Sequence, residues 1–399
     1  MEMSLIYSLD QPPAIIIGVT WANGLGLIRS LGQVGVPILA LDPQPGAIGF
    51  FSRYTSHSLV CPDPDVDEQA FLEFLDQLAQ RLGQPGVLFL TRDQDLAAVS
   101  RNQSWLKGDY HVPFASWDVV SQIVDKRGQY RVAEELGVPL PITHFPCDEG
   151  QVQAAVQAMP FPVILKPAYH ARFSEHFGAK ALVAHDPDQA LEQYRRGAAL
   201  GYDMMMQEII PGGPERLYTY GSYLNPQGEP LAEFTGRKLR QHPRTFGTCR
   251  MGECRAAPQV VEQGLRLLRA LGFWGVSQVE FKLDPRDDQF KLMEVNARNY
   301  QWQHLATVCG ANLAHAAYRD AIGKTVTPTV ASAYGKRWVL AATDLALTPA
   351  EVLRGQMPVG SWLQSWRGVA VDGIFSRRDL RPGLHYLWGQ VYRRAGGRP

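Results

Sequence analysis

Residues 275–300, GVSQVEFKLDPRDDQFKLMEVNARNY, carry the strongest structural signal in the chain. Two runs of alternating apolar and polar side chains flank the turn-forming sequence DPRDD, a pattern typical of two antiparallel strands joined by a tight connection. Alternation places Glu280 and Lys282 on one face of the first strand, and Glu294 and Asn296 on one face of the returning strand. We therefore expect the hairpin to bring Glu280 beside Glu294 and Asn296.

Two carboxylates and an amide oxygen on neighbouring strands are hard oxygen ligands of the kind that Mg²⁺ takes when it also bridges phosphates. Arg298 follows directly and adds a cation beside this set. A solvated strand face with two acidic residues gives the same pattern, because exposed alternating charge is common in antiparallel sheets. The hairpin alone leaves both interpretations open.

Two upstream stretches also carry polar groups at strand ends. Lys166 ends the apolar run PVILKP, where an ammonium is costly to bury unless an anion compensates it, so it either meets a phosphate or reaches solvent. Residues 204–213, MMMQEIIPGG, read as a strand that enters a turn and opens a series of longer strands in an antiparallel or mixed sheet. This turn would leave backbone groups of Glu208 and Ile210 free to bind a flat base, with Glu215 accepting from sugar hydroxyls.

The N-terminal part of the chain alternates short apolar runs with amphipathic stretches, which predicts a parallel sheet covered by helices. A strand-to-helix turn is expected at Asn23, Gly24 and Gly26. This turn is half of a dinucleotide-binding motif, because Arg29 occupies the position of the third glycine and Asp42 ends the next strand. A nicotinamide-dependent enzyme, a substrate pocket and a purely structural turn all stay open.

Length and composition narrow the classes of function. The 399 residues suffice for two or three domains, and Lys+Arg equals Asp+Glu at 39 each, so no net charge favours nucleic acid or an anionic membrane surface. Glu2 and Asp10 lie where a signal peptide would be positive, and the five cysteines form no C-x-x-C pair. We expect a cytoplasmic protein with reduced thiols and with neither nucleic acid nor membrane as a partner.

Taken in chain order, these stretches resemble the ATP-grasp superfamily. The matching elements are DKRGQY around Lys126, VILKP with Lys166, the hinge QEIIPGG, and VEFK followed by EVNAR. The resemblance covers about residues 118–324 and is strongest to D-aspartate ligases and related carboxylate-amine ligases. It implies an α/β chain, α+β in its second half, with these parts: a Rossmann-like domain over 1–116, an ATP-grasp domain over 117–324 with a small lid at about 146–210, and an extension over 325–399 packed on the body.

The resemblance also implies a role for each matching residue. The implied contacts to ATP are Lys126, Lys166, Gln207, Glu208, Ile210 and Glu215. The implied ligands of one or two Mg²⁺ ions, with Mn²⁺ as an alternative, are Glu280, Glu294 and Asn296. The implied catalytic cations are Arg298, Lys238 and Arg244. Such an enzyme activates a small-molecule carboxylate as an acyl phosphate, transfers it to an amine and releases ADP and phosphate, and a homodimer is the default expectation.

Two segments depart from a simple match. Many ATP-grasp proteins carry a glycine-rich phosphate loop after the strand lysine, whereas HARFSEHFGAK has only Gly178. The side chains that would replace the backbone amides, unless the segment is an inert surface lid, are His170, Arg172, Ser174 and His176.

The stretch TGRKLRQHPRTFGTCRMGE is too interrupted by glycine and proline for one strand. We expect a substrate-covering loop, or else a solvated basic loop, that carries Lys238, Arg240, Arg244 and Arg250.

Two alternatives within the superfamily stay open at this point. One is a carboxylase that uses bicarbonate, and the other is a regulatory protein that binds ATP without turning it over. The first predicts bicarbonate-stimulated ADP release, and the second predicts saturable ATP binding without hydrolysis.

Overall fold

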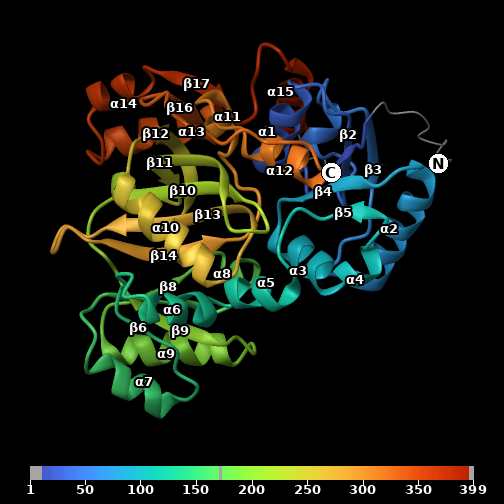
Figure 1. Cartoon of the computed structure of the whole chain (residues 1–399). Coiled ribbons are helices and arrows are strands. Elements are labelled where there is room, and N and C mark those ends of the chain that lie inside the picture. The colour runs from blue at the N-terminus through green and yellow to red at the C-terminus, as the bar shows by residue number, and fades with distance from the viewer. Residues whose placement is uncertain (1–10, 170–172, 395–399) are drawn as a thin grey trace.

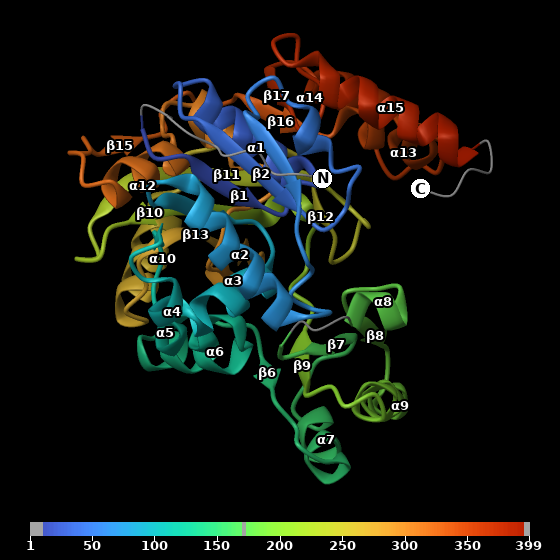
Figure 2. The same cartoon turned by 90° about the vertical axis from the view of Figure 1, so that its right-hand side faces the viewer.

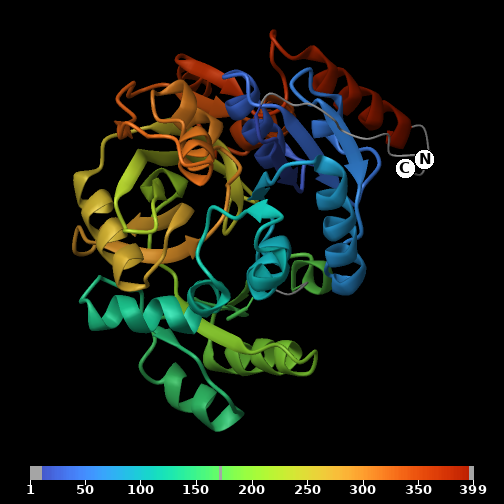
Figure 3. The same cartoon turned by 45° about the vertical axis from the view of Figure 1, so that its right-hand side comes forward.

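A computed structural model of the chain describes residues 11–169 and 173–394 (Figure 1). The strands of these residues form a five-stranded, an eight-stranded and a four-stranded sheet. The five-stranded sheet lies beside the eight-stranded one, and the four-stranded sheet forms a separate piece at one end of the molecule (Figures 1 and 3). The α/β class predicted from the sequence is confirmed.

The N-terminal sheet is parallel and has the order β3-β2-β1-β4-β5. Its central strand has only apolar side chains, all buried, as a parallel sheet covered on both faces requires. The strands are β1 (Ala14–Ile17), β2 (Ile38–Asp42), β3 (His57–Val60), β4 (Gly86–Leu90) and β5 (Tyr110–His111). The helical segments around them are α1 (Ala22–Gly32), the 3₁₀ turn η1 (Ile48–Phe51), α2 (Glu68–Leu82), α3 (Asp93–Arg101) and α4 (Gln103–Leu106).

The predicted turn at Asn23, Gly24 and Gly26 is wrong in detail, because α1 already begins at Ala22. A Cβ atom on Gly24 would lie 2.5 Å from the Cα of Val19, so glycine is needed there for the helix to pack against the end of the first strand. The Asp42 carboxylate accepts hydrogen bonds from the backbone N–H groups of Thr20 and Gln44. Both features have a structural explanation and give no support to a dinucleotide site.

The large sheet has the strand order β14-β13-β10-β11-β12-β16-β17, and the short β15 pairs with β11. Its strands are β10 (Leu217–Leu224), β11 (Pro230–His242), β12 (Thr248–Cys254), β13 (Gly275–Leu283), β14 (Phe290–Asn296), β15 (Thr329–Val330), β16 (Arg337–Val339) and β17 (Val369–Asp372). The accompanying helices are α5 (Trp117–Val124), α6 (Lys126–Glu135), α10 (Pro258–Ala270), α11 (His304–Val308), α12 (Leu313–Ala321), α13 (Ala341–Leu353), α14 (Val359–Ser365) and α15 (Leu380–Arg394).

The small sheet, which we call the lid sheet, has the order β6-β9-β7-β8. Its elements are β6 (Thr143–His144), α7 (Glu149–Val156), β7 (Val163–Pro167), α8 (Phe173–Phe177), β8 (Leu182–Ala184), α9 (Pro187–Ala198) and β9 (Met204–Glu208). The 3₁₀ turn η2 (Pro214–Arg216) follows. Grouping the MMMQE run with the longer strands after it was wrong: β9 pairs with β6 and β7, and all five of its residues are buried. An unbroken apolar run marks a central strand but not the sheet that contains it.

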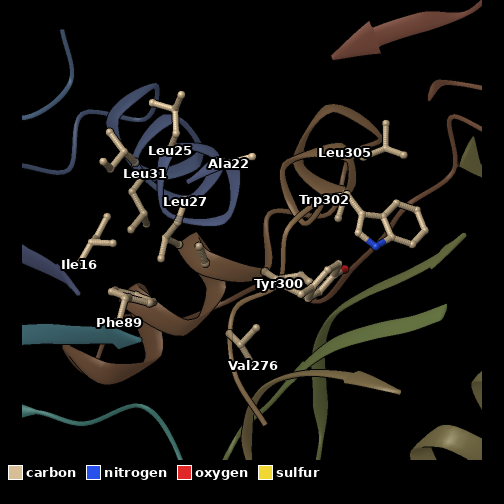
Figure 4. Packing of buried hydrophobic residues seen from close by; sticks show 14 of the residues in the cluster. Ile16, Ala22, Leu25, Leu27, Leu31, Phe89, Val276, Tyr300, Trp302 and Leu305 are labelled. Carbon is tan, nitrogen blue, oxygen red and sulfur yellow. The ribbon is translucent and has the colours of Figure 1, made fainter. Parts of the chain in front are cut away.

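Two hydrophobic clusters join the N-terminal sheet to the large sheet. Figure 4 shows Leu27 and Phe89 from the N-terminal part in one cluster with Val276, Tyr300 and Trp302 from the large sheet and the segment after it. Residues beyond 324 belong to the same assembly, because β16 and β17 extend the large sheet. The two clusters therefore fix the N-terminal strand ends relative to β13 and β14. The domain boundaries given above stay a prediction.

Candidate active site

A cavity of about 710 Å³ lies where the lid sheet, the large sheet and the N-terminal sheet meet. Among the described residues that line it, seven side chains are cationic and four are carboxylates. The cations are Lys126, Lys166, Lys180, Lys238, Arg244, Lys282 and Arg298, and the carboxylates are Asp93, Glu208, Glu280 and Glu294. This excess of positive charge favours a polyanionic ligand.

The β13–β14 hairpin places Glu280 directly opposite Glu294, and Gln278 opposite Asn296. The alternation in the sequence predicted this arrangement. The Nζ atom of Lys238 lies 2.9 Å from the carboxylate of Glu280, and that of Lys126 lies 3.2 Å from the carboxylate of Glu294. Each carboxylate thus has a cationic partner from another element.

The donor set on this hairpin fits a hard cation, because it consists of two carboxylates and one amide oxygen. Within residues 11–169 and 173–394, no group of three His, Cys, Asp or Glu side chains could hold a metal ion. An ion bound at Glu280 and Glu294 would therefore need Asn296, water or ligand oxygens to complete its coordination. Mg²⁺ commonly binds in this way, with few protein carboxylates and substrate phosphates.

Two lysines approach the carboxylate pair, one from α6 and one from β7 of the lid sheet. Lys126 begins α6, and only 2% of its side-chain surface is exposed. Lys166 extends from β7 and donates a hydrogen bond of 3.1 Å to Oε1 of Gln207. Burial, and then the neighbouring Lys126 ammonium, lower the pKa of Lys166 to about 8. A buried ammonium whose charge is opposed by a second ammonium favours an anion as its neighbour.

The contact of Gln207 with a nucleotide stays a prediction. Its side chain is fully buried and does not line the cavity. Besides accepting from Lys166, Gln207 donates to the hydroxyls of Tyr130 at 2.6 Å and Thr143 at 3.0 Å. Gln207 therefore positions the ammonium of Lys166.

The hinge after β9 forms one wall of the cavity, but its backbone is less free than predicted. The N–H of Glu208 donates to the carbonyl of Ile142 at 2.9 Å, and the carbonyl of Ile210 accepts from Nζ of Lys282 at 2.7 Å. The Glu208 N–H is paired because the chain before β6 continues alongside β9. The Ile210 carbonyl is paired because Lys282 extends from β13 to the hinge. The Glu208 carboxylate is held by Ile142 N–H and by Arg286.

Apolar residues also line this cationic cavity. They are Ile209 and Ile210 of the hinge, Ile164 of β7, Leu217 of β10 and Met293 of β14, which we together call the apolar slot. Glu215 is exposed, accepts a hydrogen bond from the Gly213 N–H at 3.2 Å and does not line the cavity. An apolar slot beside clustered cations suits a ligand with one flat and one anionic end.

Arg298 connects the hairpin to the N-terminal sheet. Its Nε and Nη2 atoms lie 2.7 Å and 3.0 Å from the two carboxylate oxygens of Asp93, and Nη2 also donates to Oδ1 of Asn296 at 3.3 Å. Asp93 was not predicted from the sequence. Its position just after β4 was the available signal, because ligands bind at the carboxyl ends of parallel strands.

The basic stretch forms the β11–β12 hairpin and not one long loop, since β11 continues to His242 and β12 begins at Thr248. Lys238 turns to Glu280, and Arg244 lines the cavity from the connection while donating to the Gln356 carbonyl at 3.2 Å. The prediction of a substrate-covering or solvated loop is wrong for the other two cations of this stretch, Arg240 and Arg250. Arg240 and Arg250 are buried away from the cavity, in contact with Asp344 of α13 at 2.7 Å and 3.1 Å.

The segment after β7 contributes less than expected. His170 and Arg172 lie outside the described residues. Ser174 lines the cavity, whereas His176 is within 2.7 Å of the Tyr202 hydroxyl in the aromatic cluster of the lid. Lys180 lines the cavity and was not singled out in the sequence, although it is the last residue of the quoted segment HARFSEHFGAK.

Comparison with known proteins gives matches over most of the chain. Residues 254–328 match the family described as the carbamoyl-phosphate synthase L chain ATP-binding domain. A D-aspartate ligase of Enterococcus faecium is 25% identical over 247 residues, which are 59% of this chain and 58% of that protein. A carbamoyl phosphate synthase large chain of Thermomicrobium roseum is 26% identical over 76% of this chain and 28% of its own length. The chain thus spans less than two thirds of the length of these relatives.

Solved structures share the fold at low sequence identity. The N5-carboxyaminoimidazole synthetase of Staphylococcus aureus aligns with a TM-score of 0.65 and 13% identity over 97% of this chain and 98% of its own. The biotin carboxylase of Campylobacter jejuni aligns with a TM-score of 0.61 and 16% identity over 79% of this chain and 72% of its own. The L-amino acid ligase of Bacillus licheniformis aligns with a TM-score of 0.54 and 16% identity over 72% of this chain and 67% of its own.

Proposed function

Because the chain belongs to the ATP-grasp superfamily, we propose that it is an ATP-dependent ligase that joins a small-molecule carboxylate to an amine. The observation that carries this proposal is the meeting of Lys126 and Lys166 with the Glu280–Glu294 pair in one cavity. ADP and magnesium ADP occur in structures of related enzymes, which supports ATP and Mg²⁺ as the cofactors. The similarity to a D-aspartate ligase supports an amino acid as one of the substrates.

The nucleotide would lie with its base in the apolar slot at the hinge and with its phosphates toward the lysines. Lys126 and Lys166 would hold the phosphate oxygens, and Gln207 would keep the Lys166 ammonium in place. Glu280, Glu294 and Asn296 would hold one or two Mg²⁺ ions, which when bound neutralise phosphate charge and orient the transferred group. Lys238 and Lys126 would then exchange their carboxylate partners for phosphate oxygens.

The reaction would proceed in two balanced steps. An oxygen of the substrate carboxylate attacks the γ-phosphorus, the bond to the bridging oxygen breaks, and ADP leaves with that electron pair. The amine nitrogen then attacks the acyl carbon, the carbon–oxygen bond to phosphate breaks, and phosphate leaves while the amine proton passes to solvent. Arg298 and Arg244 would stabilise the negative charge on the phosphoryl group and on the carboxylate.

A carboxylase is the second candidate, since the alignment with the Staphylococcus aureus synthetase extends over almost the whole of both chains. In that case bicarbonate would be the activated carboxylate. The same cavity residues would serve, because the phosphoryl-transfer step is unchanged. A protein that binds ATP without turnover is the third outcome to be distinguished.

The test measures ADP and phosphate release by the purified protein with ATP and Mg²⁺. Bicarbonate, amino acids and other small carboxylic acids are supplied singly and in pairs, with Glu294→Gln as the inactive control. Turnover that requires one organic acid and one amine supports the ligase. Turnover stimulated by bicarbonate alone supports the carboxylase, and saturable ATP binding without turnover under any mixture contradicts both.

A further inference from the structure

The outward face of α15 is apolar over the whole length of the helix. Its residues at helical spacing are large and hydrophobic, and between 49% and 69% of the surface of each is exposed: Leu380, Leu384, Leu387, Trp388, Val391 and Tyr392. Surface helices of globular proteins normally show the opposite pattern, with apolar residues inward. A contiguous exposed apolar stripe of this kind marks a binding surface.

The inward face of the same helix is fixed to the body. The His385 ring stacks on Phe51 with 3.7 Å between ring centroids, and its Nε2 atom lies 3.0 Å from the carbonyl oxygen of Gly46. Tyr386 packs near Trp21 and Phe375. Helix α15 lies along the outer edge of the molecule in two different views (Figures 2 and 3). The apolar stripe is therefore a defined surface and not one side of a loose tail.

In the sequence, arginines flank the apolar positions of α15 on both sides. Between residues 374 and 399 the sequence contains six arginines and one acidic residue. The arginines are Arg377, Arg378, Arg381, Arg393, Arg394 and Arg398. The acidic residue, Asp379, is buried and neutralised by Arg29 at 3.0 Å. The balanced charge of the whole chain thus hides one strongly basic segment.

We propose that α15 binds the surface of an anionic lipid membrane, with its apolar stripe among the acyl chains and its arginines at the headgroups. Leucines with a tryptophan and a tyrosine on one face, flanked by arginines, suit the membrane–water boundary. No helix in the described part of the chain is long and apolar enough to cross a membrane, so this contact would lie in the plane of the surface. The proposal revises the expectation from the sequence that no membrane is involved.

Charge complementarity favours lipid over a second copy of the chain. Two α15 helices packed stripe to stripe would bring arginine-bearing ends together whether they ran parallel or antiparallel, because both ends of the helix are basic and the acidic residue is already paired. Like charges in contact oppose association. An anionic surface instead complements both ends at once.

Vesicle flotation tests the proposal with the full chain. Vesicles of phosphatidylcholine alone are compared with vesicles of equal parts phosphatidylcholine and phosphatidylglycerol. We expect the bound fraction to be more than about tenfold higher on the anionic vesicles and to fall with added salt. The double variant Leu387→Glu with Trp388→Glu should abolish binding, and Arg377→Gln with Arg378→Gln and Arg381→Gln should reduce it. Leu200→Glu, an exposed leucine of the lid, should bind like the unmodified protein.

Two results would overturn the proposal. One is equal or absent binding to both kinds of vesicle. The other is a dimer in solution that dissociates in the Leu387→Glu and Trp388→Glu variant, which would identify a second copy as the occupant. Unchanged circular dichroism and thermal unfolding of the variants verify that the altered residues act at the surface. None of these measurements depends on ATP turnover.

Discussion

Glu280 and Glu294 face each other across the β13–β14 ladder, and each is neutralised by a lysine from a different element. Two carboxylates opposite each other in a sheet repel unless cations compensate them. Lys238 and Lys126 supply this compensation in the structure. A metal ion at the carboxylates would free both lysines for phosphate, so metal binding and nucleotide binding should reinforce each other.

The variant Glu294→Gln tests this relationship. Removal of one charged ligand should lower ATP turnover by about 100-fold or more and raise the Mg²⁺ concentration needed for the half-maximal rate. Steady-state kinetics over a series of Mg²⁺ concentrations measure both effects. Glu262→Gln, at an exposed site on α10, is the matched control and should leave both unchanged. An unaltered Mg²⁺ dependence in Glu294→Gln would show that the hairpin is not the metal site.

The pKa of Lys166 predicts how ATP affinity depends on pH. Burial, followed by repulsion from Lys126, lowers this pKa to about 8, so the ammonium is protonated below that pH and loses its charge above it. The dissociation constant of ATP should therefore rise by up to about fivefold from pH 8 to pH 9. Lys166→Arg should flatten the profile, because a guanidinium stays charged. Parallel profiles for the two proteins would refute this assignment.

Asp93 should act through Arg298 and not through the nucleotide. The bidentate contact at 2.7 Å and 3.0 Å fixes the guanidinium, so Asp93→Asn should lower kcat for ATP turnover by about 10- to 100-fold with little change in ATP affinity. Asp109→Asn, at an exposed turn, is the control. If ATP affinity falls as strongly as kcat, Asp93 contributes to the nucleotide site itself.

The sequence predicted those parts of the site that depend on local periodicity. Alternation alone places Glu280 and Glu294 on facing positions, and the apolar run PVILKP located the strand that carries Lys166. Reasoning from the sequence failed where two interacting residues lie far apart in the chain. Asp93 lies more than 200 positions before Arg298, and no local pattern joins them.

The basic hairpin shows a second limit of sequence reasoning. Lys238 and Arg240 are two positions apart and should share a face of a regular strand, yet the pairing of β11 with β12 is irregular at both residues. As a result, Lys238 meets Glu280 whereas Arg240 meets Asp344. An irregularity of this kind, together with a partner about a hundred positions away, is not encoded in the alternation of side chains.

Lys180 is expected to contribute to nucleotide binding from the lid. It lines the cavity with Lys126, Lys166 and Lys238, so Lys180→Ala should weaken ATP binding by about tenfold, as the loss of a charge-assisted hydrogen bond predicts. Isothermal titration with ATP and Mg²⁺ measures the change. Lys107→Ala, an exposed lysine of the N-terminal part, should bind ATP normally. Equal affinity in the two variants would remove Lys180 from the site.

Asp344 should stabilise the fold without taking part in ligand binding. It is fully buried, accepts hydrogen bonds from Arg240 at 2.7 Å and from the Trp362 indole at 3.1 Å, and lies 3.1 Å from Nε of Arg250. Asp344→Ala leaves two guanidiniums buried beside an uncharged side chain, which should lower the free energy of unfolding by about 3–5 kcal/mol. Thermal and denaturant unfolding measure the loss.

The same ion pairs distinguish a structural from a substrate role for the two arginines. Replacing all three charges together, with Arg240→Met, Arg250→Met and Asp344→Leu, should destabilise the protein less than Asp344→Ala alone, because no buried charge then lacks a partner except Glu351, which is partly exposed. ATP binding should be unchanged in both variants. A loss of ATP or carboxylate binding at unchanged stability would instead return Arg240 and Arg250 to the cavity, where the sequence alone had placed them.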